Sequence, residues 1–160
     1  MKFIRVILGI GIFSFLFSCS ESKNEIKSSK NTNSFEAPIF HKSHEPNKQD
    51  VPFSDAVQIG NTFYLSGQIG MNHDTRELVT GGFEAETLQT IENIRDVLWV
   101  HKVRLTDVVK VTVILENMED FLVFNKIYET YFPQKPARTT FAAKALVKGA
   151  KIEIEVVAVK

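Results

Sequence analysis

Residues 108–115 read Val-Val-Lys-Val-Thr-Val-Ile-Leu, a run dominated by β-branched side chains. Because β-branched residues pack well on a pleated surface, the run predicts a strand. The turn-forming pair Thr106-Asp107 opens it. Asn117, just beyond it, is a candidate helix cap and is followed by the acidic residues Glu119 and Asp120, which favour a first helical turn. This stretch therefore predicts a strand that leads directly into a helix.

The chain after Asn117 predicts that helix and then two further strands. Pro133 and Pro136 end the helix, because proline lacks the amide hydrogen that the helix needs. Residues 138–143 and 151–159 then predict the last two strands. The aromatic residues expected along one face of the helix are Phe121, Phe124, Tyr128 and Tyr131.

The last of these strands alternates strictly between apolar and charged residues. Ile152, Ile154 and Val156 are expected on one face of the sheet. Lys151, Glu153 and Glu155 are expected on the other face. One face of this strand should therefore meet the core and the other should not.

The chain before residue 108 predicts a hairpin and a long helix. Residues 56–59 and 62–66 form two short strands around the turn Gly60-Asn61, followed by a polar loop that ends near residue 82. A helix is expected over residues 83–101, because apolar residues recur there at intervals of three and four. These residues are Leu88, Ile91, Ile94, Val97 and Leu98.

The resulting order, β-β-α-β-α-β-β, predicts an α+β domain in which two helices cover one face of one sheet. The other face must then meet solvent or another subunit. The length of 160 residues suits one domain, and the 19 basic and 19 acidic residues balance, so no net charge favours nucleic acid. The single cysteine excludes an internal disulfide framework and a cysteine-based zinc site.

The amino-terminal end has the pattern of an export signal. Lys2 and Arg5 precede the apolar run 6–17, whose length of about a dozen residues fits a signal-peptide core and is short for a membrane span. The segment Leu16-Phe17-Ser18-Cys19 resembles a bacterial lipobox, although Phe17 is bulkier than the usual residue there. We therefore expect a lipoprotein signal over residues 1–18 and lipidation of Cys19. An ordinary secretory signal and an uncleaved anchor are the alternatives.

Lipidation of Cys19 implies an exported protein, held on the periplasmic or cell-surface side of a bacterial membrane through its lipid alone. Residues 19–48 are rich in Ser, Asn, Lys and Glu, a composition that buries too little apolar surface to fold, and they predict a flexible tether. The folded domain is expected over residues 49–160.

None of the common catalytic signatures is present: the chain has no phosphate-binding loop, no GxSxG and no HExxH. The unusual feature is the segment Pro136-Ala137-Arg138-Thr139-Thr140, which places a guanidinium on an otherwise apolar strand. An arginine there can bind a carboxylate through two parallel hydrogen bonds. The alternative is a structural ion pair with Glu153 or Glu155 on an adjacent strand.

The chain resembles the RidA (YjgF) family from about residue 52 to its end. The resemblance rests on six motifs in the order and spacing of that family. They are Pro52-Phe53-Ser54-Asp55-Ala56-Val57, Leu65-Ser66-Gly67-Gln68-Ile69, Asp107-Val108-Val109-Lys110-Val111-Thr112-Val113, Asn125-Lys126-Ile127-Tyr128, Pro136-Ala137-Arg138-Thr139-Thr140 and Lys151-Ile152-Glu153-Ile154-Glu155.

This resemblance implies a chorismate-mutase-like α+β fold and a homotrimer whose ligand clefts lie between subunits. It implies hydrolysis of reactive enamines and imines, such as 2-iminobutanoate and 2-iminopropanoate, to 2-oxo acids and ammonia without a cofactor or metal. Arg138 falls on the family's carboxylate-binding arginine and Glu153 on its water-orienting acid. Ser66-Gly67 falls on the segment that lines the cleft, and Asn125 on the conserved helix asparagine.

Two positions depart from the family pattern at the expected site. Phe53 stands where tyrosine is common, and Thr140 stands where cysteine is frequent. Each change removes a polar or reactive group beside the ligand without altering Arg138. Two other functions stay open: a protein that binds a carboxylate metabolite without turnover, and a chaperone-like trimer.

Overall fold

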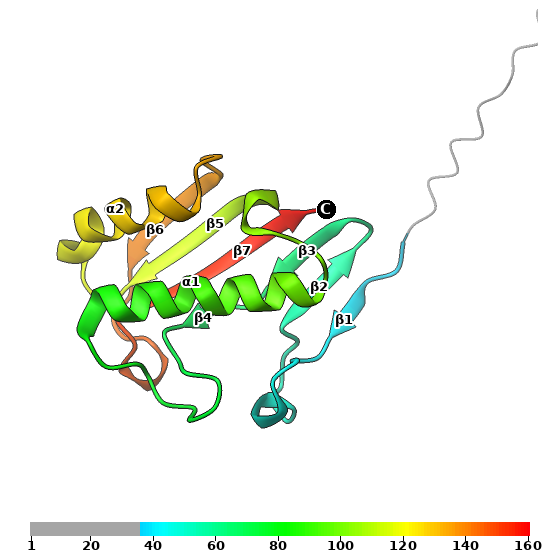
Figure 1. Ribbon diagram of the computed structural model, residues 1–160, viewed down its shortest axis with the longest axis horizontal. Helices are drawn as coiled ribbons and strands as arrows, with labels where there is room; N and C mark the ends of the chain where they lie inside the picture. Colours follow the sequence, from blue (N-terminus) through cyan, green and yellow to red (C-terminus); the bar gives the residue numbers. More distant parts are fainter. Residues whose placement is uncertain (1–35) are drawn as a thin grey trace, which may run out of the picture. The chain divides into compact units, whose positions relative to one another are not determined.

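The run at residues 108–115 forms the strand β5 (Val108–Leu115), which lies between two partners in the computed structural model. It pairs in parallel with β6 (Ala137–Ala142) on one side and antiparallel with β7 (Ile152–Val159) on the other. Val111 and Val113 are completely buried. The structure describes residues 36–160, and in its sheet β5 lies between β7 and the edge strand β6 (Figure 1).

The sheet continues from β7 toward the amino-terminal part of the described chain. Its order is β1-β2-β3-β7-β5-β6, with β4 also paired to β7. The remaining strands are β1 (Ile39–His41), β2 (Ala56–Ile59), β3 (Thr62–Leu65) and β4 (Gln68–Ile69). The β2–β3 hairpin turns at the predicted pair Gly60-Asn61, where Gly60 has a φ of 59°, a left-handed value that glycine adopts without strain.

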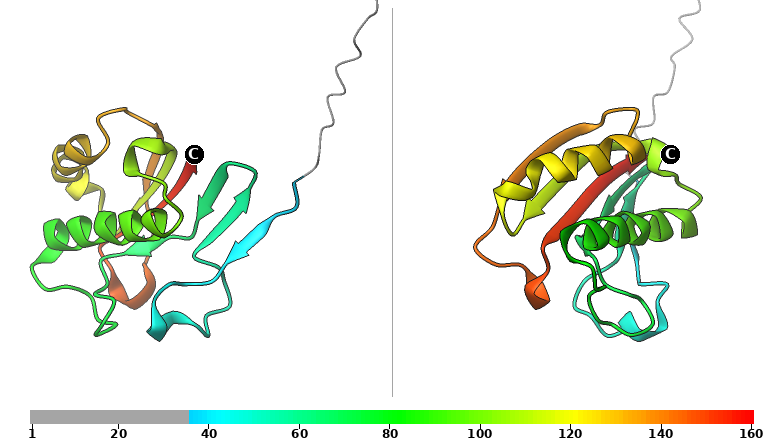
Figure 2. Two further views of the ribbon diagram at one scale, coloured as in Figure 1. Left: turned by 45° about the vertical axis from the view of Figure 1, so that its right-hand side comes forward. Right: turned by 60° about the vertical axis from the view of Figure 1, so that its left-hand side comes forward.

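Two helices lie on the same face of this sheet, α1 (Gly82–Val100) and α2 (Phe121–Tyr131), and two further views agree (Figure 2). The main core fills the space between the helices and the sheet. Ile91, Ile94 and Leu98 of α1 meet Ile152 and Ile154 of β7 there, and none of these five side chains is exposed. Burial of such side chains is the main favourable contribution to folding.

The predicted α+β class is confirmed, and so is the arrangement of two helices over one face of one sheet. The predicted bounds of α1 and of the predicted strands agree with the observed ones to within one residue. The predicted cap Asn117 instead begins a 3-10 turn over residues 118–120, and α2 starts at Phe121. The strand β4 was not predicted, because two residues carry no periodic pattern. It forms where the chain after Gly67 returns to pair with residues 153 and 154 of β7.

The predicted tether extends too far toward the carboxyl terminus, because its last part belongs to the fold. Strand β1 pairs with β2, placing Phe40 opposite Val57. Lys48 is buried and lies 2.6 Å from the carboxylate of Asp55, which is also buried. The composition of this segment predicted no packing, but ion pairing with Asp55 and pairing along the edge of β2 hold it. The predicted signal, residues 1–18, and Cys19 lie outside the described residues.

Within residues 36–160, no helix combines the length and the apolar character that crossing a bilayer requires.

The Lys48–Asp55 pair yields a prediction about stability. Lys48→Met keeps the apolar stem of the side chain but leaves the Asp55 carboxylate buried without its cation, which in comparable cases costs about 3–5 kcal/mol. Urea denaturation should show that loss in the free energy of unfolding. The matched control is Lys42→Met, an exposed lysine of the same segment, which should change the free energy little. Equal unfolding midpoints for the two variants would contradict this role of Lys48.

Candidate functional site

Arg138 lies on β6 with its side chain on the helix-covered face of the sheet. It is in register with the buried residue Val111 of β5. Its guanidinium carbon lies 4.6 Å from the ring centre of Tyr128, 5.3 Å from that of Phe124 and 5.6 Å from that of Phe121. A cation over an aromatic face is attracted by the negative charge of the ring. The aromatic face of α2 therefore holds the guanidinium in place.

The hydrogen bonding of Arg138 leaves most of its donors free. Its Nη2 donates to Oδ1 of Asn125, at 2.7 Å. Among residues 36–160, no carboxylate lies within ion-pair distance of it. The alternative of a structural pair with Glu153 or Glu155 is therefore wrong for the described chain. A guanidinium with four unused N–H donors is suited to receive an external carboxylate.

Arg138 and Asn125 line an open cavity of about 620 Å³, which we call the Arg138 cavity. Tyr128, Lys135 and Pro136 also line it. Thr140 lies two residues beyond Arg138 on the same face of β6, and its hydroxyl oxygen is buried without a hydrogen-bond partner among the described residues. Arg138, Asn125 and Thr140 were predicted to belong to one site. The structure places them on two adjoining elements, Arg138 and Thr140 on β6 and Asn125 on α2.

Glu153 extends from the opposite face of the sheet. It alternates on β7 with Ile152 and Ile154, whose side chains are buried under the helices. Partial burial raises the pKa of its carboxyl group above the ordinary value, and the nearby charge of Glu155 raises this pKa further. A carboxyl group with a raised pKa is a suitable acid or base for proton transfer near neutral pH.

The backbone at Gly67 lies against the side chain of Glu153. A Cβ atom added at Gly67 would overlap Oε1 of Glu153, so only glycine fits here without displacing the acid. Both residues, with Phe53, line a cavity of about 400 Å³ that we call the Glu153 cavity. Ser66 lies beside it, in a neighbouring hollow that Phe53 also lines, and the Ser66 hydroxyl donates to the backbone oxygen of Ser54 at 2.6 Å.

The predicted site residues thus form two groups within one subunit. Arg138 and Asn125 line one cavity, while Phe53, Gly67 and Glu153 line another. The sheet separates the groups, because its pleat directs Arg138 toward the helices and Glu153 away from them. One subunit therefore offers a carboxylate-binding half and an acid–base half that do not face each other.

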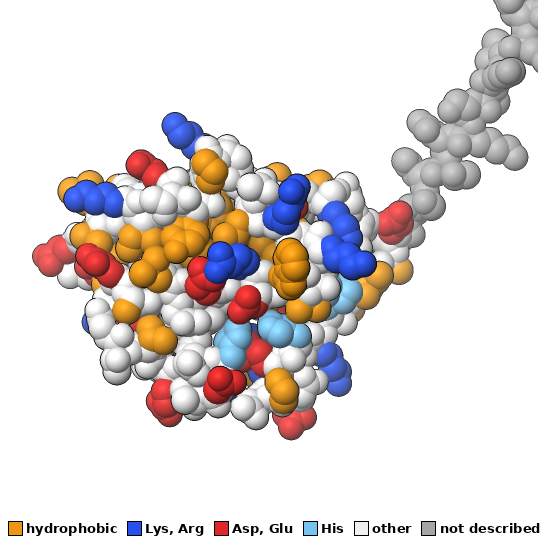
Figure 3. Space-filling view, viewed as in Figure 1, with side chains coloured by type: hydrophobic (Ala, Val, Ile, Leu, Met, Phe, Trp, Pro, Cys, Tyr) orange, Lys and Arg blue, Asp and Glu red, His pale blue; other side chains and the backbone are white. Residues whose placement is uncertain are grey.

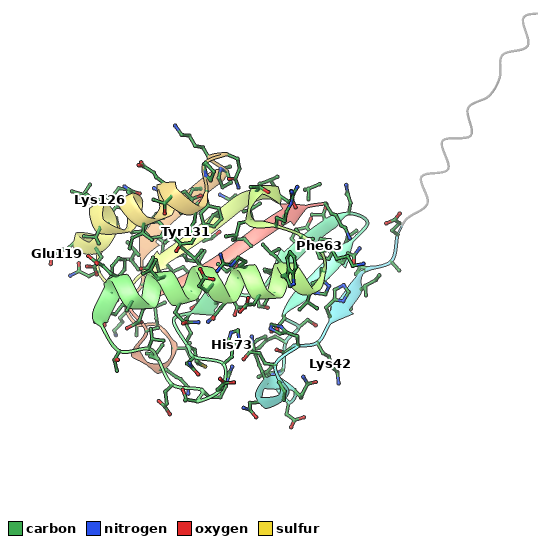
Figure 4. All side chains as sticks on the ribbon, in the orientation of Figure 1. Lys42, Phe63, His73, Glu119, Lys126 and Tyr131 are labelled. Carbon is green, nitrogen blue, oxygen red and sulfur yellow. The ribbon has the colours of Figure 1, made fainter. Side chains whose placement is uncertain are left out.

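Sequence reasoning missed several charged residues that line the Glu153 cavity. Glu45 is 4% exposed and lies 2.6 Å from Nη1 of Arg76 and 3.4 Å from Nε2 of His73. His73 comes from the loop between β4 and α1 (Figure 4). Figure 3, which shows the side of the molecule that carries α1, shows histidine and acidic side chains gathered below α1. No sequence pattern indicated this cluster, because its members lie in a polar loop and in the segment predicted to be a tether.

Comparison with known proteins adds three findings. Residues 43–160 match the family described as Endoribonuclease L-PSP. Two relatives are named 2-iminobutanoate/2-iminopropanoate deaminase. The protein of Dermatophagoides farinae is 43% identical over 109 residues, which cover 68% of this chain and 85% of the relative. The protein of Homo sapiens is 43% identical over 110 residues, which cover 68% of this chain and 80% of the relative. The crystal structure of RidA from the Antarctic bacterium Psychrobacter is 38% identical, with a TM-score of 0.66, and the match covers 69% of this chain and 90% of that one.

The raised pKa of Glu153 predicts a pH-dependent effect of Glu153→Gln on stability. Below the ordinary pKa of glutamate the carboxyl group is protonated in both the folded and the unfolded chain, so it does not alter stability there. As the pH rises above that ordinary pKa, the carboxyl group ionises first in the unfolded chain, so stability falls progressively until the pH passes the raised pKa of the folded chain. Glu153→Gln should therefore match the original protein at pH 4 and exceed it in stability at pH 8, as measured by urea denaturation.

Asp96→Asn, a change at an exposed residue of α1, is the control for loss of one negative charge. It should give no comparable gain at pH 8. If Glu153→Gln were less stable than the original protein at pH 8, the carboxylate would be stabilised by the fold and the raised pKa would be wrong.

Proposed function

This chain belongs to the endoribonuclease L-PSP family, which includes RidA, and from that membership and the two halves of the site we propose that it hydrolyses reactive enamines and imines of 2-amino acids. The products are 2-oxo acids and ammonia. Substrates of the size of 2-iminobutanoate and 2-iminopropanoate, the compounds that name its relatives, fit this chemistry. The single observation that carries the proposal is the free guanidinium of Arg138.

Arg138 supplies the binding half of the reaction. Every imine formed from a 2-amino acid carries a carboxylate beside its C=N bond, and a guanidinium can hold that carboxylate with two parallel hydrogen bonds. The rings of Phe124 and Tyr128 and the amide of Asn125 fix the guanidinium before the substrate arrives. Fixed binding of this kind lowers the entropic part of the barrier.

Glu153 supplies the proton-transfer half. Its carboxylate takes a proton from water as the water oxygen bonds to the imine carbon, giving a tetrahedral carbinolamine. The same carboxyl group returns the proton to nitrogen, the C–N bond breaks and ammonia leaves. As the C=O bond of the 2-oxo acid forms, the carbinolamine hydroxyl gives its proton to the Glu153 carboxylate, from which the departing ammonia takes it to leave as ammonium. A protonated imine is already electrophilic, so the step requires a well-placed water and an acid–base group.

A complete site requires two copies of the chain, because the sheet separates Arg138 from Glu153 within one copy. We propose a homotrimer in which the Arg138 cavity of one subunit faces the Glu153 cavity of the next. The helix-free face of the sheet supports this assembly, since an apolar row crosses it and leaves Phe40 and Tyr64 largely exposed. That row consists of Phe40, Val57, Tyr64 and Val157.

Substitution of Arg138 should separate the enzyme from a structural protein. Arg138→Lys keeps the charge and loses the planar pair of donors, and each charge-assisted hydrogen bond is worth about 1.5–3 kcal/mol. Loss of one or two should lower kcat/KM by roughly tenfold to several hundredfold. Arg138→Ala should abolish turnover almost completely without dissociating the trimer. A coupled assay with freshly generated 2-iminopropanoate and light scattering on the same samples measure both effects.

Mixing two inactive variants provides the sharper control. Arg138→Ala and Glu153→Gln chains, combined in equal amounts and reassembled, should form intact sites at about a quarter of the subunit contacts and regain about a quarter of the activity. No recovery would place both residues in one subunit's site.

Undiminished activity of Arg138→Ala would defeat the mechanism, and ligand binding without turnover in the original protein would favour a metabolite-binding role. A clean monomer in light scattering would remove the shared site.

We further propose that Cys19 is lipidated and anchors the exported domain to a bacterial membrane through its acyl chains. The support is the cationic start, the short apolar run and the lipobox-like position of the only cysteine. In a bacterium that processes lipoproteins, Cys19→Ser should leave an unlipidated precursor of higher mass, detected by mass spectrometry. Identical processing of both forms would reduce the lipobox to coincidence.

A further inference from the structure

The Glu153 cavity is larger than the smallest imino acids require. Its volume of about 400 Å³ lies within the roughly 300–1,000 Å³ of pockets that bind drug-sized molecules. Imines of three or four carbons would leave much of that space unfilled. The unused part is bounded by charged side chains from three separate segments, so the lining indicates which kind of substrate side chain it would accept.

Cations outnumber acids in this lining. Lys48, Arg76 and Lys148 line the cavity, together with the carboxyl groups of Glu45 and Glu153. Lys48 is committed to Asp55, with which it forms a buried pair at 2.6 Å. Burial and the charge of Glu155 raise the pKa of Glu153, which disfavours the charged form of this acid.

Glu45 offers little to a positively charged substrate. Its carboxylate already lies 2.6 Å from Arg76, 3.4 Å from His73 and 3.9 Å from Lys48. With 4% exposure it is also nearly inaccessible. A cationic side chain would therefore meet an acid whose charge is already shared among three basic groups.

Arg76 and Lys148, in contrast, retain unused donors. One N–H group of Arg76 binds Glu45, and the Lys148 ammonium donates to the backbone oxygen of Arg76 at 2.7 Å. A guanidinium has five N–H donors and an ammonium has three, so both can still bind an anion. Both residues also have left-handed backbone conformations, with φ of 59° and 57°, where glycine would be favoured.

We propose that the preferred substrates are imines of 2-amino dicarboxylic acids, whose second carboxylate binds Arg76 and Lys148. The inference rests on the proposed function. The carboxylate beside the C=N bond binds Arg138 of the neighbouring subunit, and the imine carbon lies beside Glu153. The side chain then extends into the remaining part of the Glu153 cavity. Lys48 and His73 hold Glu45 in place, and through it the guanidinium of Arg76.

The test compares imines generated in place by amino-acid oxidases from glutamate, from a neutral amino acid of similar length, and from lysine. The full chain should hydrolyse the dicarboxylic imine with a kcat/KM at least tenfold above the other two. Arg76→Gly should lower that value about tenfold, mainly through KM, and should affect the neutral imine much less. Glycine suits this backbone position, and Lys48 and His73 remain beside the buried carboxylate of Glu45, so the variant should fold.

Lys102→Gly is the matched control, because Lys102 also has a left-handed conformation, with a φ of 58°, but does not line the cavity. It should leave both substrates unaffected. Equal or faster hydrolysis of the neutral or lysine-derived imine, or an equal loss for all imines in Arg76→Gly, would overturn the inference.

Calorimetric binding of the 2-oxo products separates this inference from the proposed function. If no imine is hydrolysed, the proposed function fails. Tighter binding of the dicarboxylic product than of its monocarboxylic counterpart, reduced about tenfold in Arg76→Gly, would still support the second carboxylate site. Equal binding of both products would overturn it.

Discussion

The alternation of side chains across one sheet is the constraint on which the rest of this structure depends. Both helices cover the same face, so from Val111 onward every second residue of β5, and every second residue of β7, belongs to the core and the residues between them do not. Arg138 lies on the covered face and Glu153 on the other. A shift of one residue in strand register would exchange these faces and bury the acid in the core. The separation of the two groups is therefore a consequence of how the core is made.

The two functional groups are prepared by opposite means. Arg138 keeps most of its hydrogen-bond donors free because aromatic rings, and not a carboxylate, surround it. The pKa of Glu153 is instead raised, first by partial burial and then by the charge of Glu155. A direct ion pair between the two would hold both in their charged forms and occupy the donors of the guanidinium. Keeping them on opposite faces within a subunit leaves each available to a ligand.

The amino-terminal part of the described chain shows how ionic contacts can order a polar segment. Glu45, Lys48 and Asp55 are buried together with Arg76 close by, and they join the segment before β2 to the loop after β4. A buried charge is tolerated only where opposite charges accompany it. The same cluster forms one wall of the Glu153 cavity, so the elements that complete the fold also determine which charges a ligand would meet there.

The sequence by itself determined the class of fold, the two helices, and most strands, because apolar residues recur at intervals of two or of three to four in those segments. It also pointed to Arg138 as a chemically unusual residue, since an arginine on an otherwise apolar strand is visible without coordinates. Glu153 was singled out by the resemblance to the RidA family. Only the tertiary structure decided that Arg138 binds Asn125 and aromatic rings in place of an acid, and that Glu45, Lys48 and Arg76 line a cavity. The physical reason is that local periodicity records which face a residue occupies, whereas the partner of a charge depends on segments far apart in the chain.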